Sequence, residues 1–442
     1  MIGFDDIEYA SLSDVGVRRS HNQDAHATLP AGDVDQYRAR GHVFLVADGM
    51  GAHAVGELAS KLAADSIPHI YTKHAQEGPI AALRKAFVEA NQHIHNRGKA
   101  NREFEGMGTT ATAILLRPEG AWVGHVGDSR AYRIRHGKIE QLSFDHSLVW
   151  ELARRQRKAP EELQGIPPNV IVRSLGPDAS VQVDVEGPHP MQAGDTYLLC
   201  SDGLSGPVSD REIGAVAMAL PPAEACRFLV QLANMQGGPD NITCMVVRVG
   251  AAKPEGNSDA TINIASSSSA SIDLPSEPLQ TRLRRLPWPI ILISLGIVLA
   301  VFAIWFSIYQ LPGSITMFVF AGLTLLGGVL AFMVEHLREN QQQAEPEEVR
   351  TLQIYRQTPC TIDQNMIRRI EEARGVLQQL IRDNELKADN ALSQQYHEIA
   401  NRALAAGDLT EAFRARCRAM LVLMEAIHQQ HGKGESFKPL WD

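Results

Sequence analysis

The segment HVFLVADG, His42 to Gly49, decides the fold prediction, because an unbroken apolar run ends in an aspartate that a glycine follows. A run rich in Val, Leu and Phe predicts a buried β-strand. The pattern returns in HVGD ending at Asp128, in LLCSDG around Asp202, and in GGPD ending at Asp240, which precedes the run ITCMVV. One aspartate at a strand end is usually a turn former. Four of them converge only if something neutralises their charge.

A hard divalent cation would neutralise these aspartates. Mg²⁺ and Mn²⁺ prefer carboxylate, carbonyl and water oxygens, and the neighbouring glycines let a backbone carbonyl approach closely. Histidines also occur near these motifs, but a lone histidine beside a strand or turn is usually packed or solvated. We therefore leave these histidines out of the predicted metal shell: His21, His53, His125 and His146.

Other short apolar runs predict further strands, and runs with apolar residues three and four apart predict helices. The predicted strands are 42–47, 109–116, 121–127, 131–135, 196–200 and 242–249, and the predicted helices are 56–71, 80–96 and 222–235. Consecutive strands with interposed helices predict stacked antiparallel sheets covered by helices, an α+β arrangement.

The composition limits the function classes. The chain has 442 residues, enough for two or three folded units. Its net charge of −9 argues against a protein that coats nucleic acid, which needs clustered Lys and Arg. Five scattered cysteines without a C-x-x-C pair fit reduced, buried thiols. The acidic first residues are unlike a signal peptide, so we expect the N-terminal part to stay in the cytoplasm.

A stretch without any charged residue runs from Leu286 to Val334. Its two halves, Trp288 to Tyr309 and Ser314 to Val334, are each about 20 residues long, the length that crosses a hydrocarbon core of about 30 Å. We predict two transmembrane helices joined by a turn at 310–313. Arginines precede the first span and basic residues follow the second, so both termini are expected in the cytoplasm.

The rest of the chain divides around this hairpin. Residues 251–285 are rich in Ser and Pro and predict a flexible linker. Residues 335–442 predict a cytoplasmic helical domain, with helices over 361–384, 391–406 and 410–430. One pair of these helices faintly resembles a tetratricopeptide unit, but a single unit does not build a core, so a plain helical hairpin or bundle is favoured. The predicted domains are 1–250, 251–285, 286–334 and 335–442.

Several motifs occur in a recognisable order between Ser11 and Val249. They are RSHNQD (19–24), DGMGAHAVGELAS (48–60), GTT (108–110), VGDSR (126–130), RSLG (173–176), SDG (201–203) and DN (240–241). This series resembles the bacterial form of the metal-dependent serine/threonine protein phosphatases of type 2C. Spaced motifs in one order are specific, whereas a single Asp-Gly pair would carry no information.

The resemblance implies a four-layer α/β/β/α sandwich of antiparallel sheets flanked by helices, with a centre of two Mn²⁺ or Mg²⁺ ions. It implies that Asp48 bridges both ions and that the Gly49 carbonyl binds one. It further implies that Asp202 and Asp240 complete the shell of the other ion. In the same way, Asp24 would hold metal-bound water and Asp128 would belong to a weaker third metal position.

Arg19 would grip the substrate phosphate in the same family pattern, since a guanidinium binds two phosphate oxygens at once. Its neighbour Arg18 is interpreted as an ordinary surface residue. Two departures from the family stand out: Gln23 replaces a common Glu, and Met50 stands where eukaryotic relatives carry a histidine proposed as general acid. The source of the leaving-group proton therefore stays open. Residues 146–172 resemble the family's variable flap, whose basic residues either meet substrate or form a solvated helix face.

The favoured hypothesis is a membrane-anchored phosphatase that hydrolyses phosphoserine and phosphothreonine by attack of a metal-activated hydroxide. Its expected partners are phosphorylated proteins, substrates of bacterial Ser/Thr kinases, with a further protein partner for the helical tail and no nucleic acid. Its expected location is the cell inner membrane, with several passes. The alternative is a catalytically silent phosphatase-like scaffold or adaptor. A channel is disfavoured because the spans contain no ionisable residue.

Overall fold

The computed structural model describes residues 3, 5–51, 54–163, 165–167, 169–250, 288–309, 314–343 and 353–430. The predicted linker 251–285, the turn 310–313 and His53 lie outside these residues. The chain forms two compact units, one made of residues 1–255 and 350–442, the other of residues 256–349. The domain boundaries proposed above stay predictions.

The first unit contains two antiparallel sheets. One has the strand order β1-β11-β10-β7-β8-β12. The other has the order β2-β3-β5-β6-β9, with the short β4 paired to β3. The first sheet consists of β1 (Ile7–Asp14), β7 (Arg130–Arg135), β8 (Lys138–Gln141), β10 (Thr196–Cys200), β11 (Ile242–Val249) and β12 (Arg356–Pro359). The second consists of β2 (Asp24–Leu29), β3 (His42–Met50), β4 (Gly108–Thr109), β5 (Ala111–Arg117), β6 (Gly120–Val126) and β9 (Asp184–His189).

Strand β3 shows why the sheets stack. Its side chains alternate between two faces, as in any strand. Phe44 and Val46 enter a core between the sheets, together with Met245 and Leu199 of the other sheet. Leu45 and its neighbours on the opposite face enter a second core under two helices. A strand buried on both faces requires the continuous apolar run that its sequence shows.

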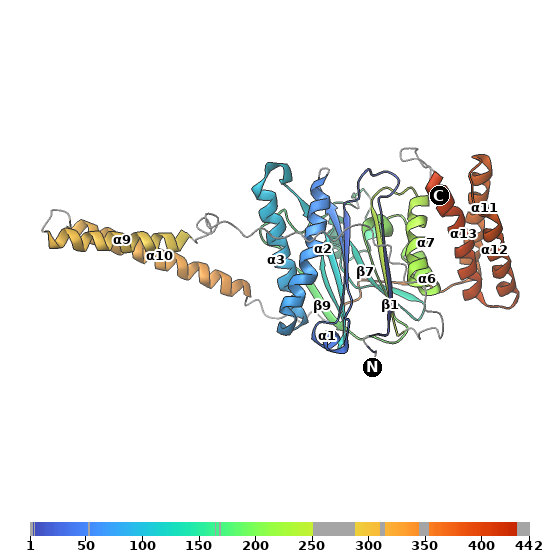
Figure 1. The fold of residues 1–442 in the computed structure, drawn as a ribbon, viewed down its shortest axis with the longest axis horizontal. Helices are drawn as coiled ribbons and strands as arrows, with labels where there is room; N and C mark the ends of the chain where they lie inside the picture. The colour runs from blue at the N-terminus through green and yellow to red at the C-terminus, as the bar shows by residue number, and fades with distance from the viewer. Residues whose placement is uncertain are drawn as a thin grey trace. The chain divides into compact units, whose positions relative to one another are not determined.

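Helices cover the outer faces of both sheets (Figure 1). On one side lie α2 (Ala54–His74) and α3 (Pro79–Ala100), and on the other lie α6 (Asp210–Ala219) and α7 (Pro222–Met235). The remaining short helices of this part are α1 (Val34–Ala39), α4 (Leu148–Gln156), the 3-10 helix η3 (Pro160–Glu162) and α5 (Asp202–Ser205). The predicted sandwich of antiparallel sheets flanked by helices is confirmed. The five cysteines are free and buried, as predicted.

Three C-terminal helices add a further layer beside α7 (Figure 1). They are α11 (Gln364–Asp383), α12 (Asn390–Ala405) and α13 (Leu409–Gln430). Phe413 and Met420 of α13 belong to the same hydrophobic core as Phe228 of α7 and Val216 of α6. The apolar face of α13 therefore packs against the sandwich. The sequence analysis did not predict this contact.

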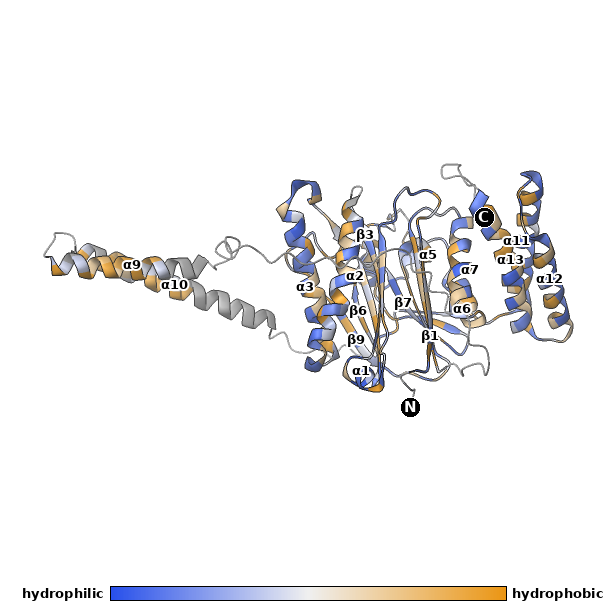
Figure 2. Ribbon diagram, viewed as in Figure 1, coloured by the Kyte–Doolittle hydropathy of each residue, from blue (hydrophilic) through white to orange (hydrophobic). Residues whose placement is uncertain are grey.

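The second unit contains two helices, α9 (Trp288–Ile308) and α10 (Ser314–Gln343), which pack against each other. Figure 2 shows hydrophobic residues along their described parts. Both helices lie where membrane spans were predicted. However, within the described parts of the chain we find no helix that is both long and apolar enough to cross a membrane. The two predicted transmembrane helices are therefore not supported by the described residues.

Candidate metal centre

Strand pairing places two of the predicted aspartates opposite each other. In the antiparallel pair of β2 and β3, Asp24 is the direct partner of Asp48. Directly opposed side chains in such a pair are about 5 Å apart at Cβ and lie on the same face. The register of one hairpin thus brings together two carboxyl groups that are 24 positions apart in sequence.

The backbone of Asp48 is held by two threonines. Its N–H donates to the Thr110 hydroxyl at 2.8 Å, and its carbonyl accepts from the Thr109 hydroxyl at 2.9 Å. The next residue must be small, because a Cβ added at Gly49 would lie 2.1 Å from the carbonyl oxygen of Gly56. The Asp48-Gly49 step is therefore fixed by close backbone packing against the start of α2.

Asp24 connects the two sheets. Its Oδ2 accepts hydrogen bonds from the hydroxyls of Ser201 and Thr243, each at 2.7 Å. Ser201 follows β10 and Thr243 lies in β11, so both donors come from the opposite sheet. The two hydroxyls orient a buried carboxylate at the end of the inter-sheet core.

Asp202 and Asp240 approach this point from neighbouring strands, β10 and β11. Asp202 begins α5 directly after β10, and Asp240 precedes β11. A Cβ at Gly203 would lie 1.9 Å from the carbonyl oxygen of Asn241, so only glycine allows these two segments to meet. This explains the Ser-Asp-Gly motif sterically.

Asp128 lies in the turn between β6 and β7. The preceding Gly127 has φ +114°, and a Cβ there would meet Thr110 at 2.5 Å. The Gly127 N–H donates to Nδ1 of His146 at 3.0 Å, and its carbonyl accepts from the His146 N–H at 2.7 Å. His146 was left out of the metal shell, and in the structure it anchors the turn that carries Asp128.

The electrostatics show that the five predicted aspartates affect one another. Burial raises the pKa of Asp48 well above its ordinary value, and the charges of Asp24, Asp202, Asp128 and Asp240 act in the same direction. Burial likewise raises the pKa of Asp24 to about 7 and that of Asp128 to about 8. The pKa of Asp202 is raised too, first by burial and then by Asp240. Mutual repulsion of this kind favours bound protons or a bound cation.

The donor chemistry fits a hard divalent cation. In the described residues, Asp24, Asp128 and Asp202 each keep one buried carboxylate oxygen, Oδ1, without a hydrogen-bond partner. Unpartnered carboxylate oxygens are the ligands that Mg²⁺ and Mn²⁺ prefer. The same described residues contain no group of three His, Cys, Asp or Glu side chains already arranged to hold a metal ion.

Arg19 already lies beside the acidic group. Its Nη2 forms an ion pair of 2.7 Å with Oδ2 of Asp240. About half of the Arg19 side chain is exposed, and a third of that of Asp240. The arginine thus lies at the solvent-facing edge of the aspartates, where an incoming anion would meet it.

Sequence reasoning missed the residues that hold the aspartates. Ser201, Thr243 and Thr110 carry no signal of their own, because hydroxyl residues are common at strand ends. Ser201 and Thr110 fall inside the motifs of the series, which is the one indication the sequence offered. Thr243 lies within an ordinary apolar strand, and only the pairing of β11 with its neighbours gives it a role.

Known proteins share this part of the chain. The family model "Protein phosphatase 2C" matches residues 10–154. The serine/threonine protein phosphatase PstP of Mycobacterium tuberculosis is 37% identical over 246 residues, 55% of this chain and 45% of that protein. The chain therefore matches less than half of the length of that relative.

A shorter relative is matched almost entirely. The protein phosphatase PhpP of Streptococcus pneumoniae is 35% identical over 249 residues, 54% of this chain and 97% of that protein. Among solved structures, the catalytic domain of PstP in complex with two manganese ions is 36% identical. That comparison covers 55% of this chain and 98% of the other, with a TM-score of 0.46.

Proposed function

Since this chain belongs to the protein phosphatase 2C family, we propose that it is a metal-dependent phosphoprotein phosphatase acting on phosphoserine and phosphothreonine. The observation that carries the proposal is the group of aspartates at the end of the inter-sheet core. Asp48 lies within the electrostatic reach of Asp24, Asp128, Asp202 and Asp240. Burying several carboxylates together costs free energy unless a cation neutralises them, so their arrangement favours a bound metal ion.

We assign the metal ligands accordingly. Asp48, the Gly49 carbonyl, Asp202 and Asp240 would hold two Mn²⁺ or Mg²⁺ ions, and Asp24 would hold water on one of them. Asp128 would serve a third, weaker position. When bound, such ions lower the pKa of a water molecule and neutralise phosphoryl oxygens. The unpartnered carboxylate oxygens described above support this assignment.

Arg19 would bind the phosphoryl group of the substrate. Its ion pair with Asp240 is exposed, and exposed ion pairs contribute at most about 1 kcal/mol, so the guanidinium exchanges partners readily. A phosphate offers two oxygens to the same planar fork. Met50 has no proton to give, so the side chains described here do not provide a general acid at that position.

The decisive experiment measures phosphate release from a phosphothreonine peptide by the full chain. We expect turnover with Mn²⁺ or Mg²⁺ and none with a chelator. Asp48→Asn and Asp240→Asn should each lower kcat by at least about a hundredfold, because each change removes a charged ligand. Asp65→Asn, an exposed aspartate of α2, is the matched control and should retain full activity. A wild-type chain inert with both metals would favour the scaffold alternative.

The substrates and location belong to the same proposal. We propose phosphorylated proteins, products of bacterial Ser/Thr kinases, as substrates. Attachment to the inner membrane through 286–334, with both termini in the cytoplasm, stays a prediction from the uncharged sequence. Its support is the exposure of large apolar side chains, such as Val301 at 61% and Leu326 at 71%. Extraction of the chain from cell membranes by carbonate at high pH would argue against it.

A further inference from the structure

The C-terminal part of the chain contributes a strand to the catalytic sandwich. Strand β12 pairs antiparallel with β8, with Arg356 opposite Gln141 and Pro359 opposite Lys138. Backbone hydrogen bonds extend the pairing on both sides, from the Tyr355 N–H to Gln141 at 3.0 Å and from the Cys360 N–H to Gly137 at 2.8 Å. Residues that follow the 256–349 unit therefore form the edge of the first sheet.

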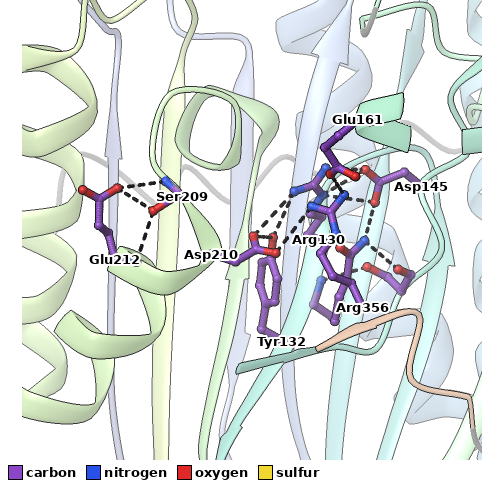
Figure 3. Close-up of polar contacts among 11 residues, drawn as sticks. Arg130, Tyr132, Asp145, Glu161, Ser209, Asp210, Glu212 and Arg356 are labelled. Atoms are coloured by element: carbon purple, nitrogen blue, oxygen red, sulfur yellow. Dashed lines mark hydrogen bonds and ion pairs between the residues drawn. The ribbon is translucent and has the colours of Figure 1, made fainter. Parts of the chain in front are cut away.

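From this strand, Arg356 reaches into the flap, residues 146–172. Figure 3 shows its guanidinium between Glu161 of η3 and Asp210 of α6. It is in contact with the Glu161 carboxylate and lies 3.4 Å from Asp210 Oδ2. It also lies over the ring of Trp150 in α4, 5.1 Å from the centroid. One side chain of the C-terminal part thus joins both helices of the flap to α6.

The same cluster continues to the Asp128 turn. Arg130 forms an ion pair with Asp145 at 2.7 Å and lies 3.8 Å from Asp210. Its guanidinium also lies over the ring of Trp150, the same ring that Arg356 contacts, 5.9 Å from the centroid. Asp210 also accepts a hydrogen bond of 2.9 Å from the Tyr132 hydroxyl. Arg130 is two positions from Asp128 and begins β7, directly after the turn that carries Asp128. Trp150 and Asp210 therefore connect Arg356 to the turn that carries a predicted metal ligand.

A polar groove of about 500 Å³ lies along this cluster. Its lining includes Arg130, Glu161, Asp210, Arg211, Arg356 and Thr358. Gly206, also in its wall, donates its N–H to the carbonyl of Asp202 at 2.7 Å. The groove therefore reaches Arg130, two positions from Asp128, and the end of the short helix α5 that Asp202 begins. Glu161 of the flap and Arg356 and Thr358 of the C-terminal strand form part of its wall.

We infer that Arg356 is a positioning residue for the phosphatase reaction, supplied by the C-terminal part of the chain. It fixes the flap against α6 and so sets the shape of the groove in which the polypeptide around the phosphoresidue lies. The inference rests on the proposed function for its kinetic consequence, but the fixing of the flap is a property of the fold alone. The C-terminal part thereby controls the affinity for a phosphoprotein and leaves the chemistry at the metal centre unchanged.

Limited proteolysis of the full chain tests the fixing of the flap without any assay of activity. Arg154, Arg155, Arg157 and Lys158 are exposed flap residues after which trypsin cleaves. Arg356→Ala should speed cleavage at these sites by about tenfold. This factor corresponds to a loss of about 1.4 kcal/mol in the free energy that holds the flap against α6. The matched control is Arg368→Ala, an exposed arginine of α11 that lies 3.9 Å from the likewise exposed Glu372. It should leave the cleavage rate unchanged.

A conservative variant separates positioning from general damage. Arg356→Lys keeps a positive charge between Glu161 and Asp210 and should retain at least part of the protection that Arg356→Ala loses. Unchanged flap cleavage in Arg356→Ala, or equal acceleration in Arg368→Ala, would overturn the inference.

Kinetics then test the consequence for substrates. Arg356→Ala should raise KM for a phosphothreonine peptide by about tenfold, with kcat for the small substrate p-nitrophenyl phosphate within twofold of wild type. Equal losses with both substrates would show a merely structural role and would contradict the inference. If the wild type hydrolyses neither substrate, the proposed function fails, and the proteolysis experiment still decides whether Arg356 fixes the flap.

Discussion

Asp48 lies where β2, β3 and the ends of β10 and β11 meet, and four other carboxyl groups act on it. Burying these carboxyl groups together makes the free energy of unfolding depend on pH. The folded-state pKa values of Asp24 and Asp128 are about 7 and about 8, above the ordinary aspartate value. A carboxyl group with a raised pKa stabilises the fold below its unfolded pKa, and this contribution is lost as pH rises through the folded pKa.

Metal binding should therefore stabilise the chain more at pH 8 than at pH 6, because the ion binds the deprotonated carboxylates. At about 100 times Kd, Mn²⁺ adds about 2.7 kcal/mol, which for a cooperative unit of roughly 350 residues corresponds to a rise in Tm of about 4 °C. Differential scanning fluorimetry at both pH values measures this rise. Asp48→Asn should abolish most of it and Asp65→Asn none. Equal rises at the two pH values would contradict the titration argument.

Helix α13 is the element that holds the C-terminal part to the sandwich. Besides its apolar face, its His428 lies 3.5 Å from Asp14 of β1. The hydrogen bond to Asp14 raises the pKa of His428, and the charges of Asp14 and Glu425 act in the same direction, against burial. A histidine with a raised pKa stabilises the folded state below its unfolded pKa of about 6.5. That stability disappears as pH rises through the folded-state pKa.

His428→Gln should consequently lower Tm at pH 5.5 and have little effect at pH 8.5. Thermal unfolding of variant and wild type at the two pH values gives the difference directly. Gln429→Ala, the exposed neighbour, is the control and should match wild type at both. A loss in Tm that is the same at both pH values would show that packing, and not the ion pair, accounts for the effect of His428.

The elements differ in how well the sequence predicted them. Strands β10 and β11 and helix α7 have the predicted bounds, because long apolar runs and a proline at the first turn define their ends. Strand β12 was missed, because RQTP has no alternation and forms only by pairing with an existing edge. The same difference holds for the site. The aspartates could be predicted from their motifs, whereas the hydroxyl groups and the Arg356 cluster could not, because they depend on contacts between segments far apart in sequence.

On the scale of the whole molecule, residues 1–255 and 350–442 form one compact unit and both contribute to one of its hydrophobic cores, so they should unfold together. Phe413, 1% exposed, lies at this junction beside a cavity of about 270 Å³ that Phe228 also lines. Phe413→Ala should destabilise the unit by about 3 to 5 kcal/mol and lower the temperature at which phosphatase activity is lost.

Calorimetry together with residual activity after heating measures both effects at once. Val376→Ala, a half-exposed residue of α11, provides the comparison and should change little. If the C-terminal helices unfolded in a separate transition that left activity intact, the shared core would not be a cooperative unit.

The division of this unit along the chain has a consequence for its biosynthesis. The ribosome completes β11 at Val249 but reaches Phe413 of α13 roughly 160 residues later, a delay of about 8 to 33 s at about 5 to 20 residues per second. During that interval the apolar surfaces of α6 and α7 have no cover, and a nascent chain in this state is a substrate for chaperones and proteases. Premature termination before the last three helices should therefore yield aggregated or degraded polypeptide.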